Sequence, residues 1–424
     1  MIPSSQPPIR VAIACGGTGG HLFPGLAVAA ALLRRGCLPM LLISSKAVDQ
    51  EAVKGVSGME IIALPAVGLK RGGELAFVRG FIQSYRAAAR LFKSRPPQAA
   101  LAMGGFTSAP PILAAKRAGA RTFLHESNTI PGRANRWLSR VVHRAFVGFP
   151  TAAGRLHNRN VTVTGTPVRP SFQAREAAFC RAKIGLDPGR PVLLVMGGSQ
   201  GASGINELVL RSLPLFACRA PDCQWLHLTG PADTEKVSRA YAALNLKAIV
   251  YPFFAEMELA LGAATAAVSR AGASSLAELA AMRLPAVLVP YPAATDNHQF
   301  HNARAFEATG AARLLDQRTA TPETLAQLLL DLVEKPAVGE KMRNALAQWH
   351  APHAAEQIAE AILLPAGVGV GKGCPTDSEP AASPGFQAAD IGSNPNPSRP
   401  SPTDRMQIHC PAGYATALPE RRAA

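Results

Sequence analysis

The sequence is poor in aromatic residues and has no spacing of cysteine and histidine that would hold a structural zinc ion. Aromatic residues make up only 6% of the 424 residues, although the formal net charge is +16. A chain this basic suits either nucleic acid or an anionic membrane surface. Because no motif interleaves basic with aromatic residues for base stacking, nucleic acid is the weaker interpretation. We therefore expect an anionic membrane surface as a partner, and no nucleic acid.

Disulfide spacing and long apolar runs are also missing. The seven cysteines are scattered, odd in number and never form a CxxC pair, a pattern that predicts reduced thiols in a cytoplasm. Residues 1–17 lack the apolar core of a signal peptide, and no apolar run reaches the roughly 18 residues that a membrane span needs. We therefore expect any membrane contact to be peripheral.

Two cofactor signatures are absent as well. Val11–Ala14 is a predicted strand that runs into the loop Cys15–His21 and then a helix over Pro24–Arg35, but the glycines are not spaced GxGxxG. The next strand, Leu41–Ser45, ends without the acid that binds a dinucleotide ribose, which disfavours NAD. No Asp-x-Asp occurs, so the simplest metal clamp is missing. We predict neither a metal nor a cofactor.

What the sequence does contain is a repeated order of strand, loop and helix. With 48% hydrophobic residues the chain is long enough for two domains with cores of their own. In the first half, predicted strands end at Gly104, at His125–Asn128 and at Gly165. In the second half, Pro191–Met196 is followed by the glycine loop Gly197–Gly204. This order predicts two α/β units, each led by a loop suited to phosphate.

The densest group of polar contacts is predicted within Ser269–Asn302. A small-residue turn over Ala271–Ser275 precedes a helix from Leu276, and its backbone N–H groups favour an anion. Glu278, one turn further on, is suited to accept two hydrogen bonds from a vicinal diol such as a ribose. The alternative is an ordinary helix start with one solvated glutamate. In the later loop, Asp296 and Gln299 suit hexose hydroxyls, and helix capping by Asp296 is compatible with that role.

Other candidates lie where predicted strands end. His21, where the first loop becomes helix, is either a proton acceptor or a structural histidine. Asn128 both donates and accepts, as a sugar hydroxyl requires. Arg169 is predicted between the domains, where its guanidinium and the Ser199 N–H suit a diphosphate. Phe254 is a candidate for holding a base.

Residues 67–96 combine apolar positions at helical spacing with a cluster of Lys and Arg. Such a segment lies on anionic lipid, or it is a core-facing helix with a solvated basic face. Beyond Pro365 the chain is rich in Gly, Pro, Ser and Ala without periodicity, and we predict disorder over 365–424.

Taken together, six motifs resemble one family, the MurG-type N-acetylglucosaminyltransferases that convert lipid I to lipid II in peptidoglycan synthesis. The likeness covers about residues 9–364 and rests on Gly16–His21 with Phe23–Gly25, His125–Asn128, Gly165–Arg169, Gly197–Ala202, Ser269–Ala273 with Glu278, and Asp296–Gln299. It implies a GT-B fold of the α/β class, in which two Rossmann-like domains face each other across a cleft. The implied domains are an acceptor- and membrane-facing domain over 1–168, completed by a helix at about 350–364, and a UDP-GlcNAc-binding domain over 169–349.

The resemblance also implies an activity. GlcNAc would pass from UDP-GlcNAc to the 4-OH of MurNAc-pentapeptide in lipid I, with inversion at C1, at the cytoplasmic face of the plasma membrane. His21 would be the catalytic base, with Glu126 as the second candidate. The residues implied to bind UDP-GlcNAc are Thr18, Gly19, Gly20, Asn128, Arg169, Ser199, Phe254, Ala273, Ser274, Ser275, Leu276, Ala277, Glu278 and Gln299. Glu278 would take the ribose, the Phe254 backbone the uracil, Ser199 and Arg169 the diphosphate, and Asn128 and Gln299 the GlcNAc hydroxyls.

Three alternatives stay open at this point. Another GT-B sugar-nucleotide enzyme, either a glycolipid glycosyltransferase or a UDP-GlcNAc epimerase, would share the loops. A sensor that binds nucleotide sugar without turnover would share them too. An NAD-dependent oxidoreductase is disfavoured by the missing GxGxxG.

Overall fold

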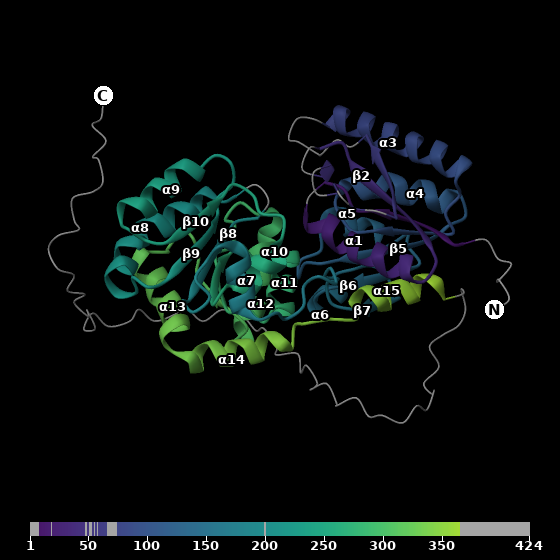
Figure 1. Cartoon of the computed structure of the whole chain (residues 1–424). Helices are drawn as coiled ribbons and strands as arrows, with labels where there is room; N and C mark the ends of the chain where they lie inside the picture. The colour runs from purple at the N-terminus through teal and green to yellow at the C-terminus, as the bar shows by residue number, and fades with distance from the viewer. Residues whose placement is uncertain are drawn as a thin grey trace, which may run out of the picture. The chain divides into compact units, whose positions relative to one another are not determined.

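The computed structural model describes residues 8–17, 19–46, 49–50, 53–54, 56, 58–65, 74–198 and 201–364 (Figure 1). The tail over 365–424, for which we predict disorder, lies outside the described residues. So do Thr18, Ser199 and the first part of the basic segment, residues 67–73. No described helix combines the length and the apolar composition needed to cross a lipid bilayer.

An N-terminal domain is built around a parallel sheet of the described strands, in the order β3-β2-β1-β4-β5-β6-β7. Its strands are β1 (Arg10–Ala14), β2 (Leu38–Ser44), β3 (Glu60–Leu64), β4 (Ala99–Ala102), β5 (Arg121–Glu126), β6 (Arg144–Val147) and β7 (Val161–Val163). Its helices are α1 (Gly19–Arg34), α3 (Glu74–Ser94), α4 (Ala109–Arg117), α5 (Arg133–Leu138) and α6 (Pro150–Ala153), with the short turn η1 (Phe106–Ser108).

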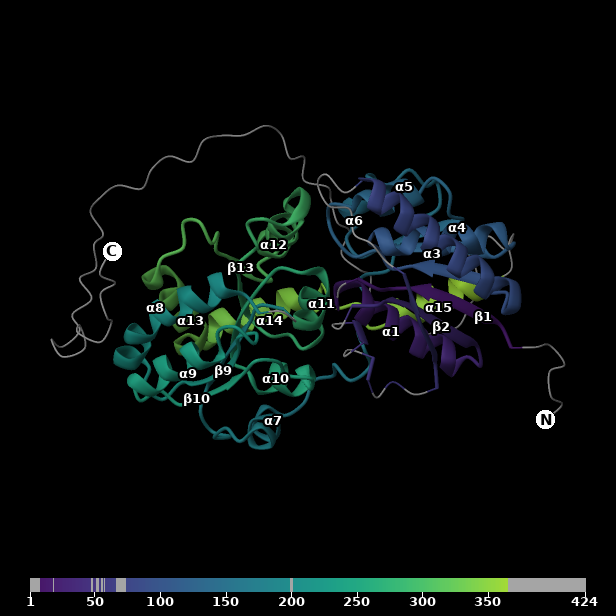
Figure 2. The same ribbon diagram turned by 90° about the horizontal axis from the view of Figure 1, so that it is seen from above.

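Both faces of this sheet are covered, because successive side chains of a strand point to opposite sides. In β1, Val11 and Ile13 belong to one hydrophobic cluster, and Ala12 and Ala14 belong to another. The first cluster includes residues of α15 (Ala354–Leu363), which lies beside α1 although more than three hundred residues separate them in sequence (Figures 1 and 2). Arg34 Nη2 donates to Glu356 Oε1 at 2.5 Å, and this contact also ties α15 to the N-terminal domain.

A C-terminal domain repeats the plan with a second parallel sheet, in the order β10-β9-β8-β11-β12-β13. Its strands are β8 (Val192–Met196), β9 (Gln224–Leu228), β10 (Ala248–Tyr251), β11 (Ala266–Ser269), β12 (Ala286–Leu288) and β13 (Arg313–Leu314). Its helices are α7 (Ala177–Ile184), α8 (Ser203–Arg219), α9 (Thr234–Ala243), α10 (Met257–Ala263), α11 (Ala273–Ala281), α12 (His298–Ala308), α13 (Pro322–Glu334) and α14 (Pro336–Ala347), with the turn η2 (Thr295–Asn297).

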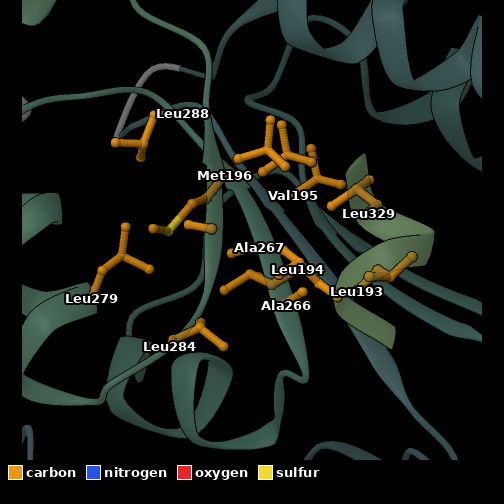
Figure 3. Close-up of a cluster of buried hydrophobic side chains, with 14 of the residues drawn as sticks. Leu193, Leu194, Val195, Met196, Ala266, Ala267, Leu279, Leu284, Leu288 and Leu329 are labelled. Atoms are coloured by element: carbon orange, nitrogen blue, oxygen red, sulfur yellow. The ribbon is translucent and has the colours of Figure 1, made fainter. Parts of the chain in front are cut away.

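The core of this domain also lies on both sides of its sheet. Figure 3 shows Val195 of β8 on the side of Leu329, and Met196 on the side of Leu279 and Leu284. Val195, Met196 and Leu329 are each at most 5% exposed. The predicted fold class, two Rossmann-like domains of the α/β class, is therefore confirmed.

Strand order decides where the polar loops meet. In each sheet the order reverses beside the first strand of the domain, between β1 and β4 and between β8 and β11. Open α/β sheets bind ligands outside the carboxyl ends of the strands at such a reversal. The loops after β1, β4 and β5 in one domain, and after β8, β11 and β12 in the other, are the loops at these edges.

One predicted boundary was wrong. We expected a turn over Ala271–Ser275 and a helix from Leu276, whereas α11 begins at Ala273 with Gly272 as its N-cap. Small residues pack closely in a first helical turn, and Ala273 itself is 8% exposed. Ser274 and Ser275 are therefore first-turn residues of the helix.

Candidate functional site

The glycine loop after β1 is held in place by an acid that the sequence analysis did not single out. Asp49 Oδ2 accepts a hydrogen bond from the Gly17 N–H at 2.6 Å and others from the N–H and hydroxyl of Ser44 at the end of β2. Gly16 lies so close to β2 that an added Cβ would be 2.3 Å from the Ser44 nitrogen. Asp49 thus binds the backbone of the glycine loop. In a dinucleotide-binding domain, the acid in this part of the fold binds a ribose instead. Because Asp49 lies five residues beyond the end of β2, no motif in the sequence indicates this contact.

His21 lies in the first turn of α1, against the loop that follows β4. A Cβ added at Gly104 would be 2.8 Å from two atoms of the His21 ring, so only glycine leaves room for it. Gly104 has φ +118°, a conformation that glycine adopts readily. Burial lowers the pKa of His21 to about 4; the Asp49 charge opposes this shift and His298 adds to it. The imidazole is therefore neutral at pH 7.

Gly19 and Gly20 begin α1, and Pro24 makes the Gly20 carbonyl available. An α-helical carbonyl normally accepts from the N–H four residues later, but proline has no N–H. The Gly20 oxygen instead accepts a hydrogen bond from Ser274 Oγ of α11, at 3.0 Å. The predicted site residues Gly20 and Ser274, 254 positions apart in the sequence, are thus brought together.

Glu126, at the end of β5, anchors the loop that carries Asn128. Its Oε1 accepts from the Asn128 N–H at 2.9 Å and from Asn128 Nδ2 at 3.0 Å. Its Oε2 accepts from the Gly132 N–H at 3.0 Å and from Asn135 Nδ2 at 2.9 Å. With four donors on two oxygens and only 3% exposure, the carboxylate is engaged by its own loop. The carboxylate therefore holds the loop that carries Asn128, and the role of Glu126 as the second candidate base stays a prediction.

Asn128 is joined to the C-terminal domain through Asn302, which the sequence analysis gave no role. Asn128 Oδ1 accepts from Asn302 Nδ2 at 3.0 Å, while its Nδ2 donates to Glu126. Each end of the Asn128 amide keeps one further hydrogen-bonding position for a ligand. Asn302 was visible in the sequence only as the last residue of a polar loop.

Arg169 lies in the connection between the two sheets, stacked between aromatic rings. Its guanidinium carbon is 4.8 Å from the ring centroid of Phe23 in α1 and 5.0 Å from that of Phe172. Its Nε is buried without a hydrogen-bond partner. Cation–π stacking of this kind leaves the edge of the guanidinium, with its N–H donors, for an anion.

Glu278 is the buried acid of α11 and is 9% exposed. Burial raises the pKa of its carboxyl to about 7; the charge of Arg169 lowers it in part and that of Glu258 raises it further. The structure therefore places Glu278 within electrostatic reach of Arg169. Of the other predicted residues in α11, Ala273 and Leu276 are buried, while Ser275 and Ala277 are partly exposed.

Two predicted residues lie on neighbouring loops of the C-terminal domain. Gln299, in the first turn of α12, accepts from the Tyr291 N–H at 3.0 Å through its Oε1, so its NH₂ group is the end left for a hydroxyl. Phe254 follows β10 and packs against the core, and its ring stacks on that of Tyr251 with 5.2 Å between the ring centroids. Within the part of the chain that the structure describes, no hydrogen bond or ring contact joins Phe254 to another predicted site residue. Among the described residues, no three His, Cys, Asp or Glu side chains form a cluster that could hold a metal ion.

Comparisons with known proteins agree with this two-domain fold. The glycosyltransferase family 28 N-terminal domain matches residues 11–147, and the glycosyltransferase family 28 C-terminal domain matches residues 192–358. A UDP-N-acetylglucosamine--N-acetylmuramyl-(pentapeptide) pyrophosphoryl-undecaprenol N-acetylglucosamine transferase from Desulforudis audaxviator is 37% identical over 375 residues, covering 85% of this chain and 100% of that protein.

Solved structures extend the likeness to the fold. The crystal structure of Acinetobacter baumannii MurG superposes with a TM-score of 0.65 at 28% identity, covering 84% of this chain and 99% of that one. A putative UDP-N-acetylglucosamine 2-epimerase from Listeria monocytogenes shares the fold at 15% identity, with a TM-score of 0.63, covering 84% of this chain and 96% of that one. From the two domain matches and the full-length relatives, we conclude that this chain belongs to glycosyltransferase family 28, in its MurG branch.

Proposed function

We propose that this chain transfers GlcNAc from UDP-GlcNAc to the 4-OH of the MurNAc-pentapeptide of undecaprenyl-diphosphate-linked lipid I, giving lipid II. The observation that carries the proposal is the full-length match to relatives whose names state this donor and this acceptor class. Glu278, Arg169 and the start of α11 offer the contacts that a nucleotide diphosphate needs. The product would serve cell-wall biogenesis, and through it cell shape and division.

In the proposed reaction, the muramoyl 4-OH attacks C1 of GlcNAc and the bond from C1 to the UDP oxygen breaks. The configuration at C1 changes from α to β, the hydroxyl proton passes to a base, and the negative charge that develops stays on UDP. The transition state resembles an oxocarbenium ion. Of the two predicted bases, His21 is the better candidate, because its ring is neutral at pH 7 and both oxygens of Glu126 are engaged.

The same geometry supports the proposed donor contacts. Glu278 accepts hydrogen bonds from the ribose hydroxyls. The guanidinium N–H groups of Arg169 bind the diphosphate together with the loop after β8. Asn128 and the NH₂ group of Gln299 bind GlcNAc hydroxyls. The assignments of the uracil to the Phe254 backbone, of the diphosphate to Ser199 and of Thr18 to the donor stay predictions from the family resemblance.

Radiolabelled UDP-GlcNAc incubated with a lipid I analogue tests the proposal. We expect label in lipid II and one free UDP per transfer, in EDTA as well as without it, because the chain has no Asp-x-Asp. Three controls separate the alternatives. An epimerase alters UDP-GlcNAc without lipid I, a glycolipid transferase labels a different lipid, and a sensor binds the donor without releasing UDP. No label in lipid II, with the donor bound, would count against the proposed function.

We further propose that α3 attaches the chain to the cytoplasmic face of the plasma membrane as a peripheral protein. One side of α3 packs into the domain through Ser84, Ala88 and Phe92. Another side leaves an apolar stripe in solvent at helical spacing: Leu75 is 89% exposed, Val78 52% and Ile82 42%. The buried side is that of a core-facing helix, and the exposed stripe supports the proposed contact with lipid, because the two sides are separate.

The basic residues of α3 favour an anionic surface. Arg79, Arg86 and Arg90 are exposed on the same helix as the apolar stripe. Each cation near an anionic leaflet contributes about 1 kcal/mol, and the contribution falls within a Debye length. An exposed apolar stripe beside cations is the pattern of helices that lie in a lipid interface.

Sedimentation with anionic vesicles tests this attachment. Reversal of three α3 charges (Arg79→Glu, Arg86→Glu, Arg90→Glu) should abolish binding. The same charge change made in the C-terminal domain (Arg211→Glu, Lys247→Glu, Lys341→Glu) should reduce binding much less. Equal binding by both triple variants would show that net charge, and not α3, directs attachment.

A further inference from the structure

Asn302 of α12 is a fully buried amide with every hydrogen-bonding position occupied. Its Oδ1 accepts from the Thr129 N–H and from Thr129 Oγ1, both at 2.9 Å. Its Nδ2 donates to Asn128 Oδ1 at 3.0 Å and to the Ala271 carbonyl at 3.2 Å. A side-chain amide has two lone pairs and two donor hydrogens, so these four bonds use all of them.

The four partner atoms belong to three residues, on two loops that follow strands of different sheets. Asn128 and Thr129 follow β5 of the N-terminal domain, and Ala271 follows β11 of the C-terminal domain. Asn302 is thus the one amide that the described contacts place between the loop anchored by Glu126 and the loop that starts α11. A buried polar group is costly to leave unpaired, so this arrangement is favoured only when both loops keep these relative positions.

We propose that Asn302 is a positioning residue for the transfer reaction, which sets the loop carrying Asn128 against the start of the donor-binding helix α11. This inference rests on the proposed function. Asn302 need not touch either substrate, because it acts through the oxygen of Asn128 on one side and the carbonyl of Ala271 on the other. Groups that hold reacting atoms in an attack geometry affect turnover more than affinity, and a misplacement of about 1 Å can cost about 100-fold.

Three further contacts support a role in joining the two domains. Ser274 Oγ donates to the Gly20 carbonyl, Arg169 stacks on Phe23, and Arg136 pairs with Asp296 at 3.1 Å. These three are partly exposed or bridge side chains at the surface, whereas Asn302 has no exposed surface. Of the four, Asn302 therefore has the strictest geometric requirement.

The test separates turnover from donor binding. In Asn302→Ala we expect kcat to fall about 10- to 100-fold, while the Kd for UDP-GlcNAc, measured by calorimetry without acceptor, changes less than about threefold. Thr129→Val removes one of the four bonds in a side chain of similar shape, and should lower kcat by a smaller factor. The double variant should be no slower than Asn302→Ala, because both changes act on the same contact.

Asn158→Ala is the matched control for stability. The Asn158 amide also joins distant backbone, donating to the carbonyls of Ser139 at 2.8 Å and Val142 at 2.9 Å, but entirely within the N-terminal domain. It lies before β7, at the opposite edge of the sheet from the site. We expect Asn158→Ala to lower Tm and to leave kcat unchanged.

Two outcomes would overturn the inference. If Asn302→Ala lowers only Tm, as Asn158→Ala does, the residue is structural; if it weakens donor binding with kcat unchanged, it is a ligand contact. Thr129→Val decides the matter if Asn302→Ala does not fold, since an unchanged kcat in that variant contradicts coupling. Failure of the proposed function is distinguishable, because then the unaltered chain itself makes no lipid II.

Discussion

Glu278 offers the most direct measurement, because its environment predicts both an affinity and a pH dependence. Burial raises the pKa of its carboxyl to about 7. At pH 7 about half of the molecules therefore carry the carboxylate that accepts both hydroxyls of a ribose. Glu278→Gln keeps the shape of the side chain but retains only one acceptor oxygen and no charge.

The magnitude follows from the lost hydrogen bond. A hydrogen bond to a charged group contributes about 1.5–3 kcal/mol, so losing one should cost about 2 kcal/mol, or about 30-fold in the Kd for UDP-GlcNAc. In the unaltered chain, binding at pH 6 must first remove a proton from a group with a pKa of about 7. Affinity should therefore rise by about tenfold between about pH 6 and pH 8, and Glu278→Gln should remove this dependence.

Calorimetric titration of UDP-GlcNAc without acceptor, at three pH values, provides the assay. The phosphates of the donor are diesters that do not titrate in this range, so a slope reports on the protein. Glu258→Gln is a control, because the charge of Glu258 raises the pKa of Glu278. It should move the transition to lower pH and keep the affinity found at high pH. A Kd that is flat with pH in the unaltered chain and unchanged in Glu278→Gln would refute the ribose assignment.

Two other predictions concern glycine and histidine. Gly104→Ala should lower kcat by displacing the His21 ring. Gly119 is also at positive φ (+87°), but nothing lies within 4 Å of a Cβ added there, so Gly119→Ala should lower only Tm. Equal kcat values in the two variants would contradict the packing argument. Burial lowers the pKa of His125 to about 4 and of His227 to about 3, so each stays neutral in the folded chain while the unfolded chain binds protons below pH 6.5. The free energy of unfolding should therefore be constant above pH 6.5. At lower pH it should fall by about 1.4 kcal/mol per pH unit for each histidine, until the pKa of that histidine in the folded chain is reached. Urea unfolding at about pH 7.5 and pH 5 measures the loss, and equal free energies at both would contradict it.

Much of the fold could be predicted because its signals are local. The apolar run Val11–Ala14 and the glycines that follow it predict a buried strand and a loop, and β1 occupies Arg10–Ala14. In parallel sheets the carboxyl ends of the strands share one edge, so residues after successive strands can be expected to converge. Glu278 and Arg169 were singled out in this way, and the structure places them within electrostatic reach of each other.

The residues that the sequence did not reveal act through distant partners. The contact between Thr129 and Asn302 spans 173 positions, and no local spacing indicates it. The carboxylate of Asp49 was missed for a related reason, since its partner is the backbone N–H of Gly17, which has no side-chain signature. Glu126 was recognised as polar and well placed, but its role depends on four donors that only the folded loop assembles.

The engaged carboxylates explain why a weakly basic histidine is nevertheless the better candidate for the proton acceptor. Glu126 accepts four hydrogen bonds and is 3% exposed, and Asp49 is fully buried and binds the Gly17 N–H and Ser44 through one oxygen, so neither is presented to a substrate hydroxyl. A pKa of about 4 leaves His21 neutral at pH 7 but makes it a weak base. The Gly20 carbonyl contacts Ser274 of α11, so a diphosphate bound at the start of α11 would bring negative charge near His21. Negative charge raises the pKa of an imidazole, so His21 would become a stronger base when the donor is bound.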